Sequence, residues 1–418
     1  MTPHRNPTED FKELKLPNGL KAYLRADRSL PLASLQVWVR CGSIDEPSHQ
    51  MGIAHFLEHM VFKGNPKTKD ISRIVESRGG SINASTQQDL THYYVDLPRE
   101  GLEAVVDALG AVLSSPELED KEVENERRVV LEEMTRHDDS PNACLWDKFM
   151  ETCLKGTPYS RRIIGTRGTV GSIGPDDLGR FHERHYTASR MVVTAAGDFE
   201  EGWMLKRLAA AFQGIPLGKP SNGIARRGAR SESSHKPAVV RRDVQQAYIA
   251  AGFPTPGLHS PHVVTLELLA DILGGGASSR LYKELREDKE LVWSLASHFT
   301  GFARSGMLSI FAELKPANVK ATLEEIREGI GRLSREPPSL QELHRAKSRL
   351  KSQWLWDMET LHGQAAVMGH LSALGRADIA RTYLADLEKT EPRDIQRTCR
   401  ELLCEKSMAV AVIRPRKS

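Results

Sequence analysis

The hydrophobic and polar positions along the first part of the chain predict strands that are separated by longer stretches of helical periodicity. Residues 20–24 and 33–39 run apolar or alternate, as strands do. The Asn-Gly pair at 18–19 precedes the first of them and predicts the turn of a hairpin. Residues 52–62 and 71–77 predict helices, each followed by a glycine-containing stop. This order of elements indicates a mixed α+β fold.

The same succession of predicted strands and helices continues, with two strand-like stretches in 81–97, amphipathic helices over 102–113 and 120–137, and a strand at 191–196. A polar segment rich in glycine, proline and serine then interrupts the pattern. After it the order begins again, with predicted elements at 245–251, 263–273, 279–287 and a last strand at 408–412. The repetition predicts two copies of one α+β unit.

We therefore expect two homologous domains, each a mainly antiparallel sheet packed with helices. The N-terminal domain is expected over residues 1–217, the flexible linker over 218–236, and the C-terminal domain over 237–418. A chain of 418 residues is long enough to form two domains with separate cores.

Composition narrows the class of protein. The formal net charge is +3, from 58 basic and 55 acidic residues, which gives no case for nucleic acid as a partner. No run of about 18 apolar residues occurs, so no membrane span is expected. The first residues do not resemble a secretion signal, and the five cysteines are an odd number without paired spacing. These features favour a cytoplasmic protein with reduced cysteines. They are equally consistent with a protein whose targeting segment has been removed.

The strongest chemical signal lies on the predicted helix over residues 52–62. His55 and His59 are four residues apart, so both imidazoles lie on one helix face and can reach one zinc ion. Glu58 lies near that face and can act as a general base on zinc-bound water, whose pKa falls to about 7. The alternative interpretation is that three polar side chains merely cover an exposed helix face.

A catalytic zinc site usually takes three protein ligands and leaves one position to water. The predicted helix over 120–137 offers several glutamates as the third ligand, and helical spacing alone does not choose between Glu132 and Glu133. The order of the motif, His-x-x-Glu-His, is that of the inverted zinc peptidases.

Residues 42–43 and 52–64 together resemble the pitrilysin/insulysin family, which includes the mitochondrial processing peptidases. The resemblance covers nearly the whole chain, and the length is similar to the processing-peptidase branch. It implies that Glu133 is the third ligand to a single zinc ion, because Glu133 closes the family's pair of glutamates seven residues apart. It also implies that the first glutamate of the pair, Glu126, orients a ligand or the water.

The resemblance further implies a peptide-binding edge strand around Asn83 and Ala84, where an extended substrate adds by main-chain hydrogen bonds. In the second half it places Arg286 at the position of a substrate-contacting arginine. The family's tyrosine seven residues later is Trp293 here, which has an indole N–H but no hydroxyl. A homodimer, or a heterodimer with a homologous subunit that supplies an Arg/Tyr pair, is therefore expected.

These features together predict a zinc metalloendopeptidase that acts on peptides or unfolded segments. Two alternatives remain open. One is a non-catalytic or partner-dependent subunit of the same fold, although such subunits typically lack zinc residues that are intact here. The other is a peptidase that matures one peptide within a biosynthetic pathway.

Overall fold

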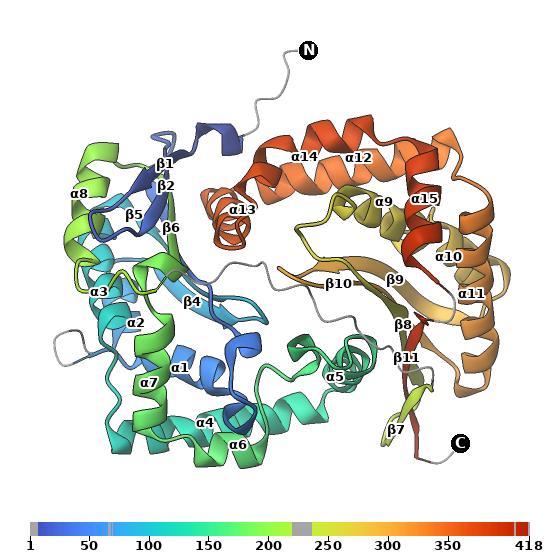
Figure 1. Ribbon diagram of the computed structural model, residues 1–418, viewed down its shortest axis with the longest axis horizontal. Coiled ribbons are helices and arrows are strands. Elements are labelled where there is room, and N and C mark those ends of the chain that lie inside the picture. The colour runs from blue at the N-terminus through green and yellow to red at the C-terminus, as the bar shows by residue number, and fades with distance from the viewer. Residues whose placement is uncertain (1–6, 66–67, 69, 220–235, 405–406, 417–418) are drawn as a thin grey trace. The chain divides into compact units, whose positions relative to one another are not determined.

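The computed structural model describes residues 7–65, 68, 70–219, 236–404 and 407–416 (Figure 1). The strands in chain order are β1 (Lys12–Lys15), β2 (Lys21–Ala26), β3 (Leu32–Val39), β4 (Ser81–Thr86), β5 (Thr91–Pro98), β6 (Met191–Gly197), β7 (Ala238–Arg242), β8 (Ala247–Thr255), β9 (Val292–Gly301), β10 (Gly306–Leu314) and β11 (Ala409–Pro415).

The helices fall between these strands, and short 3₁₀ turns connect several of them. In the first half they are α1 (Ile53–Phe62), α2 (Ile71–Glu76), α3 (Leu102–Ser114), α4 (Asp120–Asp139), α5 (Pro141–Cys153), α6 (Arg167–Ser172), α7 (Pro175–His185) and α8 (Glu201–Ala211). In the second half they are α9 (Val263–Gly274), α10 (Arg280–Tyr282) with the π-helical segment η7 (Lys283–Asp288), α11 (Val319–Arg335), α12 (Leu340–Asp357), α13 (Leu361–Ala373), α14 (Ala377–Lys389) and α15 (Pro392–Leu402).

The described residues form two compact units, and each unit takes three separate segments of the chain. Unit 1 takes residues from 1–134, 162–223 and 355–381. Unit 2 takes residues from 135–161, 224–354 and 382–418. Of the predicted linker over 218–236, residues 220–235 lie outside the described part of the chain.

The sheet of unit 1 has the strand order β1-β2-β6-β3-β5-β4. Strands β2 and β6 run parallel, and the other neighbouring pairs run antiparallel. The predicted hairpin is present, because Lys15 pairs with Lys21 and Gly19 has the positive φ of 90° that its turn requires. Strand β4 lies at the edge of this sheet.

The two faces of this sheet differ in chemistry. Side chains such as Leu35, Val37 and Val39 on β3 join the main apolar core together with Phe56 and Leu57 of α1. Helix α13 packs on β3 and β6, and Figure 1 shows it on the face opposite to α3 and α8. Because strand side chains alternate between faces, the residues between the core positions of β3 point toward α13.

The face under α13 carries a stack of aromatic and imidazole rings. The rings of Trp38 and His92 stack with centroids 3.5 Å apart, and His370 of α13 meets Trp38 edge-on. At the start of α13, His362 Nδ1 lies 2.9 Å from a carboxylate oxygen of Asp96. Burial lowers the pKa of His92 to about 3 and that of His370 to about 4, so both rings are neutral at pH 7.

The sheet of unit 2 repeats the strand order of unit 1 apart from the edge strand β1. Its sheet has the order β7-β11-β8-β10-β9, again with one parallel pair, β7 with β11, beside antiparallel neighbours. Helix α5 packs on β8 and β11 of this sheet, as α13 packs on β3 and β6 of the other. Each sheet is therefore covered on one face by a helix from the other half of the sequence. The expected α+β fold with two homologous copies is confirmed.

A stability prediction arises from Glu267, a partly buried glutamate of unit 2. Burial raises the pKa of Glu267 to about 7, although the hydroxyl of Tyr383, 2.6 Å away, opposes the rise. A raised folded-state pKa means that stability is lost as the pH rises from about 4.5 to about 7. We expect Glu267→Gln to increase the free energy of unfolding by about 1–3 kcal/mol at pH about 8 and by nearly nothing at pH about 4.5. Denaturant unfolding at both pH values measures this, and an equal effect at both would contradict it.

Within the described part of the chain, no helix is both long enough and apolar enough to cross a membrane.

Candidate metal centre and edge strand

Helix α1 is held in place at its N-terminus by a buried carboxylate. Glu46 accepts hydrogen bonds from the backbone N–H of Gly52 at 2.9 Å and of Ala54 at 3.0 Å. These N–H groups belong to the first turn, where they have no partner within the helix, and the negative charge also suits the positive end of the helix dipole. Gly52 has φ of 95°, which favours glycine. The helix that carries the two histidines therefore begins at a fixed point.

His55 and His59 of α1 and Glu133 of α4 come together in unit 1. Glu133 Oε2 lies 3.7 Å from His55 Nε2 and 3.4 Å from His59 Nε2. One ligand atom from each of the three residues lies within 4.8 Å of the others. Ligand atoms bound tetrahedrally at about 2.0–2.1 Å from zinc are about 3.3–3.4 Å apart, so the separations fit one zinc ion with small adjustments. Glu132, the alternative that spacing allowed, is exposed and is not part of this group.

Glu126 is not one of these candidate ligands but contacts one of them, His59. Its Oε1 is 2.8 Å from Nδ1 of His59, and its Oε2 is 2.6 Å from Nζ of Lys63. A hydrogen bond from Nδ1–H to Glu126 leaves Nε2 as the nitrogen that can face a metal ion, which is the usual arrangement around metal-binding histidines. Burial lowers the pKa of His59, but hydrogen bonds to Glu126 and Glu133 outweigh it and raise the pKa to about 9 in the metal-free protein.

A change at Glu126 should weaken metal binding without removing a ligand. We expect Glu126→Gln to lower the affinity for Zn²⁺ by roughly 10–100-fold, because the amide no longer carries the charge that orients His59. Competition with a zinc-binding dye measures the affinity. Glu124→Gln, an exposed position on the same helix, is the matched control and should leave it unchanged. Equal affinities for wild type and Glu126→Gln would show that Glu126 has no such role.

Glu58 is almost completely buried, with 8% of its surface exposed. Its Oε2 accepts a 2.5 Å hydrogen bond from the hydroxyl of Thr86 on β4. Burial raises the pKa of Glu58, while the hydrogen bond from Thr86 lowers it. Glu58 is outside the three-residue ligand group but lies on the same helix, between His55 and His59 in sequence. The carboxylate is thus fixed beside the candidate metal centre and linked to the edge strand.

Strand β4 presents one side to β5, and its other side is the edge of the sheet. Asn83 pairs with Tyr94 of β5, and Ala84 pairs with Tyr93. Because Asn83 and Ala84 are consecutive residues of a strand, their side chains point to opposite faces of the sheet. The backbone N–H of Ala84 donates to Oδ1 of its own neighbour Asn83 at 2.8 Å. Because Thr86 shares a face with Ala84, the strand brings the candidate peptide-binding edge next to Glu58.

Arg286 and Trp293, the other two predicted substrate contacts, belong to unit 2. Arg286 lies in η7, and Trp293 lies in β9 with 44% of its surface exposed. Their roles therefore stay predictions. Sequence reasoning assigned no role to Thr86 and Lys63, which acquire one through their contacts with Glu58 and Glu126.

A second pair of histidines in unit 1 does not form a metal centre. His182 and His185 of α7 are both buried. His182 Nε2 lies 2.8 Å from the carbonyl oxygen of Leu113, and His185 Nδ1 lies 3.0 Å from the guanidinium of Arg190. Both rings are thus used in packing and hydrogen bonding, and neither belongs to the ligand group found among the described residues.

Comparison with known proteins gives matches along the chain. Residues 21–167 match the family described as insulinase (peptidase family M16), and residues 172–350 match the peptidase M16 inactive domain. A protein named uncharacterized zinc protease from Mycobacterium tuberculosis is 31% identical over 426 residues, with 100% of this chain and 97% of that protein covered. A second protein named uncharacterized zinc protease, from Streptomyces coelicolor, is 28% identical over 412 residues, with 96% of this chain and 89% of that protein covered.

Among solved structures, a protease from Helicobacter pylori has a similar fold, with a TM-score of 0.89. It is 24% identical in sequence, and the match covers 97% of this chain and 99% of that one. At this level of identity the similarity shows the fold.

Proposed function

Because the chain belongs to the insulinase family of peptidases, M16, we propose that it is a zinc metalloendopeptidase that hydrolyses peptides held as an added strand on β4. The observation that carries the proposal is the convergence of His55, His59 and Glu133 at separations that suit one zinc ion. The relatives' names, which include zinc protease, support the same metal.

In this proposal His55, His59 and Glu133 hold the zinc ion, whose role when bound is to act as a Lewis acid toward the peptide carbonyl. Glu58 takes a proton from the attacking water and later gives it to the leaving amine. Its buried position favours this exchange, because a raised pKa lets the carboxyl hold the proton between the two steps. The Thr86 hydroxyl fixes the orientation of the Glu58 carboxylate.

The substrate is positioned by backbone hydrogen bonds. The N–H of Ala84 is now satisfied by the side chain of Asn83, and an added strand would take over that hydrogen bond. Asn83 would then be free to contact the substrate. Contacts of this kind depend on an extended backbone more than on side chains, so they suit peptides and unfolded segments. Arg286 is proposed as a further contact from the second half.

The proposal includes a second subunit, either a copy of this chain or a homologous one. Trp293 stands where the family resemblance places a tyrosine, and a partner could supply that hydroxyl together with an arginine. The non-catalytic alternative has one observation in its favour, the match of residues 172–350 to a domain described as inactive. The candidate metal ligands and Glu58 lie in the other matched segment, residues 21–167, and all are present.

Removal of the metal tests the proposal directly. The purified chain is incubated with a peptide library, alone and mixed with candidate partner chains, and cleavage is followed by mass spectrometry. We expect a zinc chelator to abolish cleavage and added Zn²⁺ to restore it, since the zinc site lies at the centre of the proposed chemistry. Cleavage that continues at full rate after metal removal would refute the proposal. Cleavage by the chain alone at an ordinary enzymatic rate would refute only the need for a different partner.

A further inference from the structure

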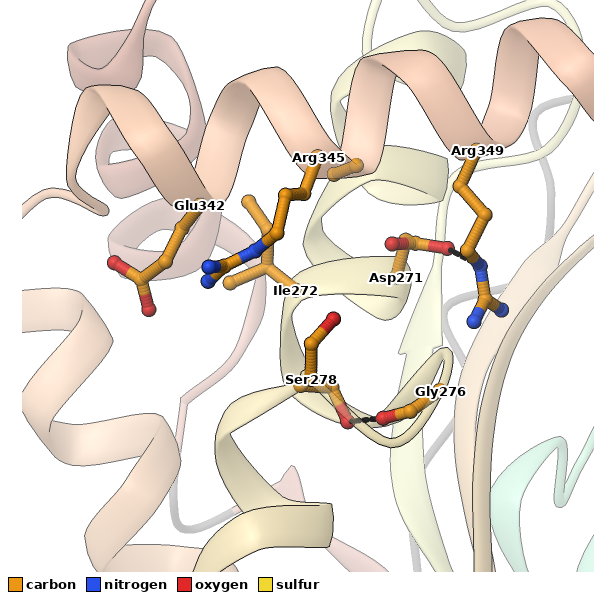
Figure 2. Close-up of a pocket in the computed structure, with 9 residues that line it drawn as sticks. Asp271, Ile272, Gly276, Ser278, Glu342, Arg345 and Arg349 are labelled. Atoms are coloured by element: carbon orange, nitrogen blue, oxygen red, sulfur yellow. Dashed lines mark hydrogen bonds and ion pairs between the residues drawn. The ribbon is translucent and has the colours of Figure 1, made fainter.

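The two helices that carry the candidate metal centre have counterparts in unit 2. The order β3, α1, α2, β4, β5, α3, α4 corresponds to β8, α9, α10 with η7, β9, β10, α11, α12. Helices α9 and α12 therefore correspond to α1 and α4. Among the described residues, no group of potential metal ligands lies between them. A small hollow of about 20 Å³ that is open to solvent occurs there instead, between the C-terminal part of α9, the loop that follows it and the face of α12 (Figure 2).

Two carboxylates and two guanidinium groups line this hollow, and they are not all paired with one another. Asp271 is paired with Arg349, whose Nε lies 2.8 Å from Oδ2. Glu342 is paired with Arg280 through two hydrogen bonds of 2.6 and 3.0 Å. Each carboxylate is therefore paired with a guanidinium, although the partner of Glu342, Arg280, is not itself part of the lining, and Arg345 is the fourth charged residue of the lining.

Arg345 is the one charged residue of the lining that no ion pair engages among the described residues. It is partly buried, and Figure 2 shows it reaching from α12 into the space between Glu342 and Ser278. Within the described residues its guanidinium makes no hydrogen bond or ion pair. A guanidinium has five N–H donors in a fixed plane, so an unpaired one at a pocket suits an oxyanion, which can accept two of them at once.

The loop on the opposite side of the hollow adds further donors. The backbone N–H groups of Gly276, Ala277 and Ser278 donate no hydrogen bond within the described part of the chain, and Gly276 and Ser278 line the hollow. A Cβ atom at Gly276 would overlap the guanidinium of Arg349, so only glycine lets this arginine lie against the loop. Unpaired backbone N–H groups beside positive side chains are a common setting for anions.

We propose that this hollow binds a small oxyanion such as phosphate, with Arg345 as its principal contact and Ser278 and the loop N–H groups beside it. The site is independent of the proposed peptidase chemistry. Where unit 1 gathers imidazoles and a carboxylate for a cation, α12 of unit 2 presents two guanidinium groups, of which Arg349 is paired with Asp271 of α9 and Arg345 is the proposed anion contact.

Calorimetric titration of the full chain with inorganic phosphate, and separately with acetate, tests the proposal. We expect saturable phosphate binding that weakens by about tenfold or more in Arg345→Ala, because a charge-assisted hydrogen bond is lost. Arg345→Lys should retain part of the affinity. Ser278→Asp, a change at an exposed position, should weaken binding as strongly by placing a competing carboxylate beside Arg345. The matched control is Arg400→Ala, an exposed arginine on α15, which should bind as wild type does.

The outcomes separate clearly. Saturable phosphate binding lost in Arg345→Ala and kept in Arg400→Ala supports the site. Binding of acetate with equal affinity would assign the same site to carboxylates as well as phosphates. The proposal is overturned if wild type gives no saturable binding, if Arg345→Ala binds as wild type, or if both arginine variants lose affinity equally. Circular dichroism of each variant confirms that a loss is not due to unfolding.

Discussion

Glu58→Gln is expected to lower the rate of peptide hydrolysis by about 10²–10⁴-fold while the zinc content stays that of the wild type. Glutamine has nearly the shape of glutamate and can still accept the hydroxyl hydrogen bond of Thr86, so the local structure should persist. It cannot take a proton from water, so the proposed general base is removed. Initial rates on a cleaved peptide and zinc content by elemental analysis are the two measurements.

Thr86→Val is a second variant for the same test, with a smaller expected loss of activity than Glu58→Gln. It removes only the hydrogen bond that fixes the Glu58 carboxylate, so a loss of about tenfold in kcat is expected with little change in zinc content. If Glu58→Gln cleaved as fast as wild type, Glu58 would have no part in proton transfer. If it lost zinc as well as activity, its effect would be on the metal centre and not on the chemical step.

Glu133→Gln is expected to remove most of the bound zinc and, with it, activity by more than about 100-fold. The substitution takes away the one carboxylate among the three candidate ligands, and zinc needs the negative charge as well as the oxygen. Glu132→Gln is the matched control, because it makes the same change one residue earlier on an exposed part of α4. Zinc content after dialysis and the rate with added Zn²⁺ measure both effects.

Opposite results for these neighbours would contradict the geometry in unit 1. Loss of zinc in Glu132→Gln with retention in Glu133→Gln would mean that α4 presents a different face to His55 and His59. Loss in both would indicate damage to the helix, which circular dichroism would reveal.

Local pattern predicted much of the fold, because most elements of this chain follow their own periodicity. The helix expected over 52–62 is α1 over Ile53–Phe62, and the strand expected over 33–39 is β3 over Leu32–Val39. The candidate metal centre is a harder case. Helical spacing placed His55 and His59 on one face, but the choice of Glu133 needed the family resemblance. In the structure the choice depends on the rotation of α4 against α1, which packing sets.

Contacts between distant segments could not be predicted from the sequence. Asp96 and His362 are 266 residues apart, and His362 has no motif around it, yet the two groups lie 2.9 Å apart. Thr86 on β4 likewise donates a hydrogen bond to Glu58 on α1, 28 residues earlier in the sequence. Both contacts depend on which element covers which face of a sheet. The predicted domain bounds describe the repeat in the sequence, whereas each compact unit also includes a segment from the other half.

Helix α13, from the second half of the sequence, covers the sheet of unit 1, and α5, from the first half, covers the sheet of unit 2. Each half of the sequence therefore depends on the other for one of its packed faces. A fragment ending near residue 217 would keep the sheet of unit 1 but lose α13, exposing Trp38 and His92 to water. A fragment starting near residue 237 would lose α5 in the same way. Neither piece made alone should be a stable protein, whereas the two expressed together should reassemble.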